Sequence, residues 1–349
     1  MNRGGDVLIV IPALNEQAHI ADVIAAMQAD VGCQEALIVV ADDHSQDATA
    51  AIVARLGQAD PRVRVLSSDR KLGVCAAINR AVELFGAGRS WLVRVDAHAG
   101  YPPNYASRLV AKAQEMDASC VVTPMVTHGG TCFQQAVAAA SNSMLGTGGA
   151  AHRLAGRGGW VDHGHHALMR LDVFMAVGGY DVGFIANEDA DLDARIGKIG
   201  GRIWLADDLA LDYYPRRSTP ALFRQYFRYG QGRAMTVARH GGRRKLRQTL
   251  PLLIAPMVGF AVLTPLFGPA CLPALGYAAL CLGYGMTLRR LSVPCSAGAG
   301  YTAMVMHVAW SAGYWRQLLG GKRPGPAPAP LLFGPQSASS RARAGSASM

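Results

Sequence analysis

Three short clusters of polar residues each follow an apolar run within the first hundred positions. The clusters are Asn15-Glu16, Asp42-Asp43 and Asp96-Ala97-His98. A carboxylate at such a position can accept hydrogen bonds from a base or a ribose, which suits a nucleotide site. Asp and Asn also cap helices and turns, which is the structural alternative. Neither Gly-x-Gly-x-x-Gly nor a P-loop occurs, so a diphosphate bound here needs a metal ion or basic side chains.

Asp96 and His98 are the candidate metal ligands, because alternate residues after a strand can turn toward one ion. Carboxylate oxygen suits Mg²⁺ and Mn²⁺, and imidazole shifts the preference toward Mn²⁺. A structural turn is the alternative explanation of this pair. His163, His165 and His166 do not predict a zinc site, because on a strand the first two share a face and the third points away. We expect them to be hydrogen-bonding histidines of the core or pocket.

The pair Glu188-Asp189 opens a predicted helix over residues 188–197. An acid at a helix start either stabilises the helix dipole or serves as a general base. Asp191 and Asp193 continue the acidic run, but the Gly and final Glu of an EF-hand are missing, which excludes a calcium loop of that type.

Alternating strand and helix patterns position these clusters. Apolar runs predict buried strands at residues 7–11, 36–40, 63–66 and 91–95, and helices are predicted at 18–27, 48–56 and 73–85. This alternation predicts parallel βαβ units, in which ligands bind at the carboxyl ends of the strands. Further along, the sequence predicts one strand over 161–170 and an amphipathic helix over 219–239.

The two parts of the chain differ in charge. Residues 1–212 carry 17 Lys and Arg against 24 Asp and Glu, a formal charge of −7, whereas residues 213–349 carry 17 Lys and Arg and no acid. The basic part contains uncharged apolar stretches at 250–267 and 270–286, with basic residues outside both. These features predict a membrane hairpin at about 250–287 whose two ends lie in the cytoplasm; a buried soluble hairpin is the alternative.

The remaining C-terminal segments are less regular. The apolar stretch at 299–319 is interrupted by His307 and Arg316, so it either spans the membrane or lies in its interface. The Pro-, Ala- and Ser-rich tail at 321–349 predicts a disordered basic segment. The seven cysteines show no Cys-x-x-Cys spacing, so free thiols in a reducing compartment are expected. The polar N-terminus predicts no signal peptide.

Taken together and in order, these motifs resemble glycosyltransferase family 2 over about residues 6–240. The matching segments are Ile9-Val-Ile-Pro-Ala-Leu-Asn-Glu, Ala41-Asp-Asp-His-Ser-Gln-Asp, Asn79, Val95-Asp-Ala-His, and Gly178-Gly-Tyr-Asp followed by Asn187-Glu-Asp-Ala-Asp-Leu. The segments Arg94-Val-Asp-Ala-His-Ala-Gly-Tyr-Pro and Asp162-His-Gly-His-His are similar to the membrane-attached glucosyltransferases of bacterial exopolysaccharide assembly, which extend a lipid-linked galactose.

The resemblance implies an α/β GT-A fold, a nucleotide-diphosphate sugar donor, Mg²⁺ or Mn²⁺, and inversion at the anomeric carbon. Asp189 would be the base, with Glu188 beside it, and Asp96 and His98 would hold the metal, although His98 replaces the family's second Asp. The implied donor-binding residues are Pro12, Asn15, Glu16, Asp42, Asp43, Lys71, Arg94 and Asp96. The residues implied for the acceptor or diphosphate are His165, His166, Gln231 and Arg233.

The sequence therefore predicts a transferase domain at 1–240, a membrane-associated region at 241–320 and the tail. The expected substrates are UDP-glucose and a lipid-pyrophosphate-linked saccharide, used at the cytoplasmic face of the bacterial plasma membrane, with no nucleic acid partner. Two other functions fit parts of the pattern. A polyprenyl-phosphate glycosyltransferase or processive synthase would share the catalytic domain, and a non-catalytic nucleotide-sugar or nucleic-acid binder would explain only the basic part. The sequence does not specify the sugar, acceptor, linkage or oligomeric state.

Overall fold

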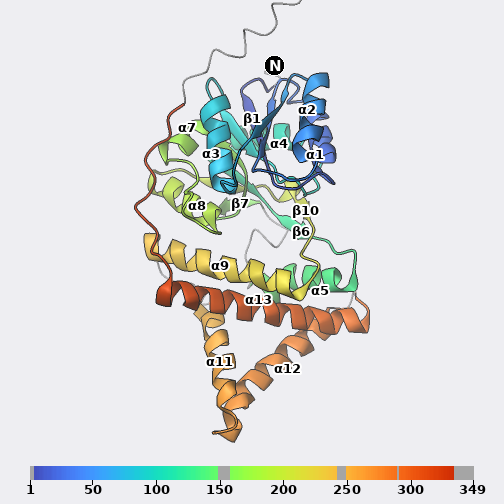
Figure 1. Ribbon diagram of the computed structural model, residues 1–349, viewed down its shortest axis with the longest axis vertical. Helices are drawn as coiled ribbons and strands as arrows, with labels where there is room; N and C mark the ends of the chain where they lie inside the picture. Colours follow the sequence, from blue (N-terminus) through green and yellow to red (C-terminus); the bar gives the residue numbers. More distant parts are fainter. Residues whose placement is uncertain (1–3, 148–157, 242–248, 289–290, 334–349) are drawn as a thin grey trace, which may run out of the picture.

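The computed structural model describes residues 4–147, 158–241, 249–288 and 291–333. Its centre is an eight-stranded sheet of order β3-β2-β1-β4-β8-β5-β9-β7, with a hydrophobic core on each face (Figure 1). The strands of this sheet are β1 Val7–Ala13, β2 Leu37–Asp42, β3 Val63–Ser67, β4 Trp91–Arg94, β5 Cys120–Thr123, β7 Gly159–Val161, β8 His165–Arg170 and β9 Ile203–Leu205. A second, two-stranded sheet pairs β6 Met125–Thr127 with β10 Leu211–Tyr213.

The first half of the domain confirms the predicted alternation. Strands β1 to β4 pair in parallel, and the apolar runs of β1, β2 and β4 are buried because helices cover both faces of the sheet. The helices of the domain are α1 Ile20–Gln28, α2 Thr49–Ala59, α3 Val74–Phe85, α4 Tyr105–Met116, α5 Cys132–Ser141, α6 Met144–Thr147, α7 Leu171–Ala176 and α8 Glu188–Lys198, with a 3-10 turn, η2, at Asp207–Leu209.

The single strand predicted over 161–170 is wrong. The chain breaks at residues 162–164 between β7 and β8, and β8 runs antiparallel to both β4 and β5. The break has a packing cause, because a Cβ on Gly164 would lie 2.5 Å from the Val122 side chain. His163 therefore stands in a bend rather than on a strand, and simple alternation does not apply to it.

Below the sheet lies a layer of helices formed by α5, α9 Thr219–His240 and α13 Val293–Gly320 (Figure 1). Helices α9 and α13 approach so closely that a Cβ on Gly230 would lie 1.9 Å from the Trp310 carbonyl, and one on Gly313 would lie 2.0 Å from that of Phe227. Gly232 similarly lies against the Ala186 carbonyl. These glycines let α9 fit between α13 and the loop before α8. Helix α13 therefore packs within this layer, and the relation of residues 299–319 to a membrane stays a prediction.

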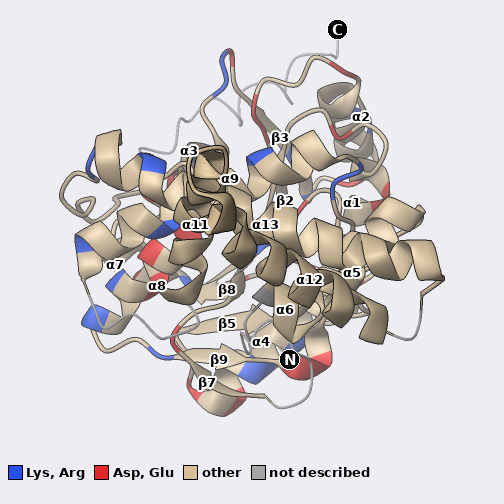
Figure 2. Ribbon diagram, turned by 90° about the horizontal axis from the view of Figure 1, so that it is seen from below, with Lys and Arg blue, Asp and Glu red and all other residues tan. Residues whose placement is uncertain are grey.

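The predicted hairpin projects away from the domain as two arms (Figure 1). It comprises η3 Leu250–Leu253, α11 Ile254–Phe260, η4 Ala261–Leu263, η5 Gly268–Cys271 and α12 Leu272–Thr287. Its large apolar side chains face outward, with Leu266 and Leu280 each 76% exposed. Residues 250–288 carry no Lys, Arg, Asp or Glu, as Figure 2 shows for α11 and α12. Among the described residues, Gly268–Thr287 is long and apolar enough to cross a membrane.

Two expectations for the C-terminal part are wrong. Cys132 and Cys295 are paired in a disulfide between α5 and α13, so these two are not free thiols. The sequence could not reveal this pair because its members are 163 residues apart. Residues 322–333 are not a detached tail, because they run back over the sheet domain, where the Leu331 amide donates to the Met175 carbonyl. The rest of the predicted tail lies outside the described residues.

Candidate active site

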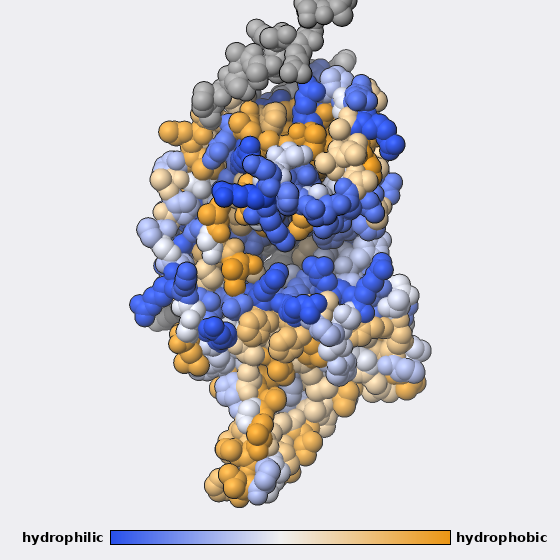
Figure 3. Space-filling view, viewed as in Figure 1, coloured by the Kyte–Doolittle hydropathy of each residue, from blue (hydrophilic) through white to orange (hydrophobic). Residues whose placement is uncertain are grey.

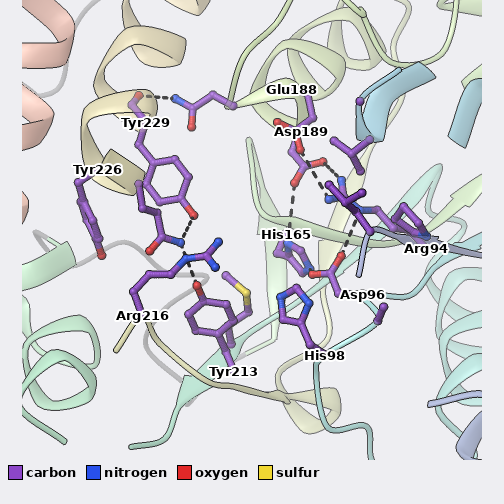
Figure 4. Close-up of a pocket in the computed structure, with 18 of the residues that line it drawn as sticks. Arg94, Asp96, His98, His165, Glu188, Asp189, Tyr213, Arg216, Tyr226 and Tyr229 are labelled. Atoms are coloured by element: carbon purple, nitrogen blue, oxygen red, sulfur yellow. Dashed lines mark hydrogen bonds and ion pairs between the residues drawn. The ribbon is translucent and has the colours of Figure 1, made fainter. Parts of the chain in front are cut away.

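A cleft of about 660 Å³ opens between the sheet and α9. One wall, which we call the charged wall, comes from the ends of β4 and β8 and the start of α8. It consists of Arg94, Asp96, His98, His165, Glu188 and Asp189. The facing aromatic wall comes from the end of β10, the following loop and the first half of α9. It consists of Tyr213, Arg216, Gln225, Tyr226 and Tyr229 (Figure 4).

Most of the residues that the sequence predicted for the site line this cleft. Those from the first hundred positions are Pro12, Glu16, Asp43, Lys71, Arg94, Asp96 and His98, and those from later positions are His165, Glu188, Asp189 and Arg233. They come together because β1, β2 and β4 are parallel and end at the same edge of the sheet.

Four predicted contact residues do not line the cleft. The Asn15 carboxamide oxygen accepts a hydrogen bond from the Gln46 amide, and Asp42 accepts one from the Ser45 amide, so both organise local turns. His166 is fully buried behind the charged wall, and Gln231 lies on α9 away from the cleft. Asp43 does line the cleft, yet its carboxylate also accepts the Leu72 and Gly73 amides, which is the capping role considered as its alternative.

Arg94 organises the charged wall from a buried position on β4. Its Nη1 donates to Asp189 Oδ1 at 2.8 Å, and its guanidinium lies 3.6 Å from both Asp96 and Glu188 (Figure 4). Burial alone would raise the pKa of Asp189, but Arg94 and the neighbouring histidines outweigh it and lower that pKa. Asp189 is therefore ionised at neutral pH, as a general base must be.

The two adjacent acids of α8 differ in their surroundings. Asp189 also accepts a hydrogen bond from the Tyr180 hydroxyl at 3.0 Å, and His165 lies 3.8 Å from its other oxygen. Glu188 has Arg94 at a longer distance, and burial together with the Asp189 charge raises the pKa of Glu188. The geometry thus stabilises negative charge on Asp189 in preference to Glu188.

A histidine–carboxylate cluster, buried except for His163, supports Asp189 from behind. His163 and His166 both bind Asp193, and the other ring nitrogen of His166 lies 3.2 Å from the Tyr180 hydroxyl. His163 and His166 therefore converge, whereas His165 points to Asp96 and Asp189, which corrects the pairing expected from strand alternation. Burial disfavours the charged forms of both His166 and Asp193. The attraction between them outweighs burial, so the pKa of His166 is raised and the pKa of Asp193 is lowered to about 2.

Sequence reasoning gave Asp193 and Tyr180 no role at the site. Asp193 follows Asp189 by four positions, so the two share one face of α8, and this spacing was a usable signal. Tyr180 lies in the Gly178-Gly179 turn, and Asn79 holds that turn by bonding the Tyr180 backbone amide and carbonyl. Its contact with Asp189 depends on the tertiary fold.

The donor set for a divalent cation consists of the Asp96 carboxylate and the His98 imidazole, which both line the cleft. His98 Nδ1 bonds Glu16 at 2.9 Å, and His165 lies 3.3 Å from Asp96. In the described part of the chain, no three His, Cys, Asp or Glu side chains are placed to hold a metal by themselves. Two donors fit a cation that takes its other ligands from water and substrate phosphates, as Mg²⁺ commonly does.

The fold and the site belong to a known class. Residues 8–178 match the model of glycosyl transferase family 2. The chain is also 48% identical over 318 residues to a protein of succinoglycan biosynthesis. The chain belongs to glycosyltransferase family 2, and its catalytic domain has the GT-A fold.

The curated relative is the succinoglycan biosynthesis protein ExoA of Rhizobium meliloti, and the match covers 90% of this chain and 96% of that protein. The succinoglycan biosynthesis protein ExoO of the same organism is 34% identical over 118 residues, 34% of this chain and 32% of that one. Among solved structures, the mannosyltransferase PcManGT of Pyrobaculum calidifontis, in complex with GDP-Man and Mn²⁺, has a TM-score of 0.58 at 18% identity. That match covers 90% of this chain and 87% of the mannosyltransferase.

Proposed function

We propose that this protein is an inverting hexosyltransferase of bacterial exopolysaccharide assembly. It would move glucose from UDP-glucose to a saccharide linked to a lipid pyrophosphate, as part of succinoglycan biosynthesis. The observation that carries this proposal is the ionised Asp189, which Arg94 and Tyr180 hold at the middle of a cleft between two different walls. The 48% identity to a succinoglycan biosynthesis protein supports the choice of pathway.

The donor occupies the end of the cleft formed by the parallel strands. Glu16 and Asp43 would face the nucleoside, and Lys71 is a cation for the diphosphate in the same lining. Asp96 and His98 would hold Mg²⁺ or Mn²⁺. Such an ion, when bound, neutralises charge on the departing diphosphate.

The chain's own residues then act on the acceptor. Asp189 takes the proton of the acceptor hydroxyl while that oxygen attacks the anomeric carbon from the face opposite the diphosphate. The new bond joins the acceptor oxygen to the anomeric carbon, the bond from that carbon to the diphosphate breaks, and the diphosphate leaves with the electron pair. Arg94 holds the Asp189 carboxylate in place, and general-base catalysis of this kind contributes about 10²–10⁴-fold to a rate.

The membrane is the proposed site of action. The exposed apolar hairpin would enter the bilayer from the cytoplasmic side, with the catalytic domain in the cytoplasm. Figure 3 shows hydrophilic side chains at the level of α9 directly above the hydrophobic hairpin. The exposed Arg224 and Arg228 of α9 suit an anionic membrane surface. Protease treatment of sealed inner-membrane vesicles tests the topology; a catalytic domain protected in right-side-out spheroplasts and cut in inverted vesicles is expected, and the reverse pattern contradicts it.

A panel of UDP- and GDP-sugars with a bacterial membrane lipid extract as acceptor tests the activity. We expect one radiolabelled hexose from UDP-glucose to enter the lipid fraction, with β configuration at the new linkage. Transfer to polyprenyl phosphate alone, or formation of a long polymer, would replace the proposal with one of its two transferase alternatives. Binding of nucleotide sugar without any transfer would favour a non-catalytic binder.

A further inference from the structure

The aromatic wall is fixed by a single amide. Gln225 Nε2 donates to the hydroxyl oxygens of both Tyr213 and Tyr229 at 2.9 Å, so one side-chain nitrogen uses its two hydrogens to hold two phenols (Figure 4). The Tyr226 ring meets the Tyr229 ring edge-on at 5.4 Å. Because Tyr213 comes from β10 and the other three residues come from α9, the two hydrogen bonds of Gln225 also join these two elements.

Arg216 completes this wall with an available positive charge. Its side chain is exposed and lines the cleft, and within the described ranges it forms neither a hydrogen bond nor an ion pair. Arg94 across the cleft is, by contrast, surrounded by three carboxylates. The aromatic wall therefore presents apolar ring faces, hydroxyl groups and one unneutralised guanidinium to whatever enters.

These groups match a saccharide that carries a phosphate. The C–H face of a hexose ring packs on an aromatic ring, its hydroxyls bond to phenols, and a guanidinium binds phosphate oxygens with paired donors. The fixed phenols reduce the side-chain entropy that binding costs.

The position of the wall favours the acceptor over the donor. Asp189 and His165 lie between the aromatic wall and the Arg94–Asp96 side of the cleft (Figure 4). The acceptor hydroxyl must touch both the base and the anomeric carbon, so the rest of the acceptor extends from the base away from the donor. The wall also stands on α9, which packs on α13, and Trp310 of α13 lines the same cleft. An acceptor anchored in the membrane reaches the cleft from this side.

We infer that the aromatic wall is the acceptor subsite: Tyr213, Tyr226 and Tyr229 hold the acceptor saccharide, and Arg216 pairs with the phosphate that links it to its lipid. This inference rests on the proposed function, because it names the residues that recognise the lipid-linked substrate at the same cleft.

Adjacent residues supply matched controls for the test. Tyr214 and Arg217 follow Tyr213 and Arg216 in the chain but do not line the cleft, and Tyr214 is 55% exposed. The four alanine variants of the full chain are assayed with two acceptors that share galactose. One acceptor is a short-chain prenyl pyrophosphoryl galactose, and the other is octyl galactoside, which has no phosphate.

Tyr213→Ala should raise the KM for both acceptors about tenfold, whereas Arg216→Ala should raise it about tenfold for the pyrophosphoryl acceptor alone. The KM for UDP-glucose should stay within about twofold of wild type. Tyr214→Ala and Arg217→Ala should resemble wild type. The melting temperature of each variant, together with the conservative variant Tyr213→Phe, shows whether a rise in KM comes from misfolding.

Two results would overturn the inference. One is equal behaviour of the cleft variants and their neighbours, and the other is a raised KM for UDP-glucose with the acceptor KM unchanged. Equilibrium binding of the prenyl pyrophosphoryl galactose without donor separates this inference from the proposed function. If wild type binds the probe through Tyr213 and Arg216 but transfers no sugar to it, the proposed function fails and the subsite stands. If wild type transfers sugar to the probe and all four variants transfer it equally well, the proposed function stands and the subsite assignment fails.

Discussion

The two walls of the cleft are built on opposite principles. On the charged wall the ionic groups have partners of opposite sign among the described residues: Arg94 faces three acids, and His98 faces Glu16. On the aromatic wall, the hydrogen bonds fix phenol rings while Arg216 lacks a counter-charge among the described residues. The arginine of the first wall is paired before substrate arrives, and the arginine of the second is not.

This contrast separates chemistry from recognition. Groups that stabilise developing charge work best when they are already oriented, because no reorganisation then accompanies the reaction. Groups that recognise an incoming substrate must leave polar atoms available. Changes to the charged wall should therefore act mainly on kcat, and changes to the aromatic wall mainly on the acceptor KM.

The largest expected effect is that of Asp189→Asn. Asn retains the shape and hydrogen-bonding reach of the side chain but cannot take a proton, so kcat should fall by about 10²–10⁴-fold while donor affinity persists. Transfer rate, donor binding and melting temperature are measured on the same variant. Glu188→Gln is the matched control and should cost far less. If Asp189→Asn keeps its turnover and melts only slightly earlier, Asp189 acts as a helix-start acid and not as the base.

Asp96→Ala should have the next largest effect. Removing this carboxylate should weaken metal-dependent donor binding by at least about 10–100-fold, the loss seen when groups that merely support metal ligands are removed. Isothermal titration with UDP, in the presence of Mg²⁺ or Mn²⁺ and in EDTA, measures it. His98→Ala should weaken binding with Mn²⁺ more than with Mg²⁺. Full activity in excess EDTA would remove the metal from the mechanism.

Asp193→Asn should lower kcat about tenfold, less than the ~10²-fold that an ångström-scale displacement can cost. It should also move the acid limb of the kcat/KM profile to higher pH. Asp193 keeps His166 protonated, and the His166 cation helps to lower the pKa of Asp189. The Asp193 charge itself raises the pKa of Asp189, but by less than the His166 cation lowers it, so the loss of both raises that pKa and the base becomes protonated at a higher pH. Asp191→Asn on the same helix should lower the melting temperature but leave the acid limb in place.

The smallest expected effect is that of Tyr229→Phe. The ring remains, but the hydroxyl that accepts from Gln225 is lost, so the acceptor KM should rise about two- to fivefold with kcat unchanged. Steady-state kinetics with the prenyl pyrophosphoryl galactose checks this. A change in kcat of similar size would mean that the aromatic wall also takes part in the chemistry, and the division between the walls would not hold.

Local sequence patterns were sufficient to predict much of the sheet and of the candidate site. The apolar runs of β1 to β4 predicted parallel strands, and parallel strands must end at one edge, so Glu16, Asp43 and Asp96 could be brought together from sequence. Tyr226, Tyr229 and Arg233 follow one another at spacings of three and four, which predicts one face of α9, although we did not use that signal.

Other features depend on contacts between distant segments. The convergence of His163 and His166 on Asp193 requires a bend at Gly164, and that bend depends on Val122 in another strand. The glycines of Tyr229-Gly-Gln-Gly-Arg233 could be matched to a motif, yet their reason is the backbone of α13 and of Ala186. No periodicity within one segment encodes which partner it will meet.

The return of residues 322–333 to the catalytic domain has a consequence for the order of assembly. This segment covers the Gly178-Gly179 turn, and a Cβ on Gly178 would lie 2.4 Å from the Ala329 carbonyl. A ribosome adds about 5–20 residues per second, so the turn that carries Tyr180 waits many seconds for its cover. The apolar hairpin is synthesised during that wait. The turn that carries Tyr180 is thus covered only in a chain that already possesses its hairpin.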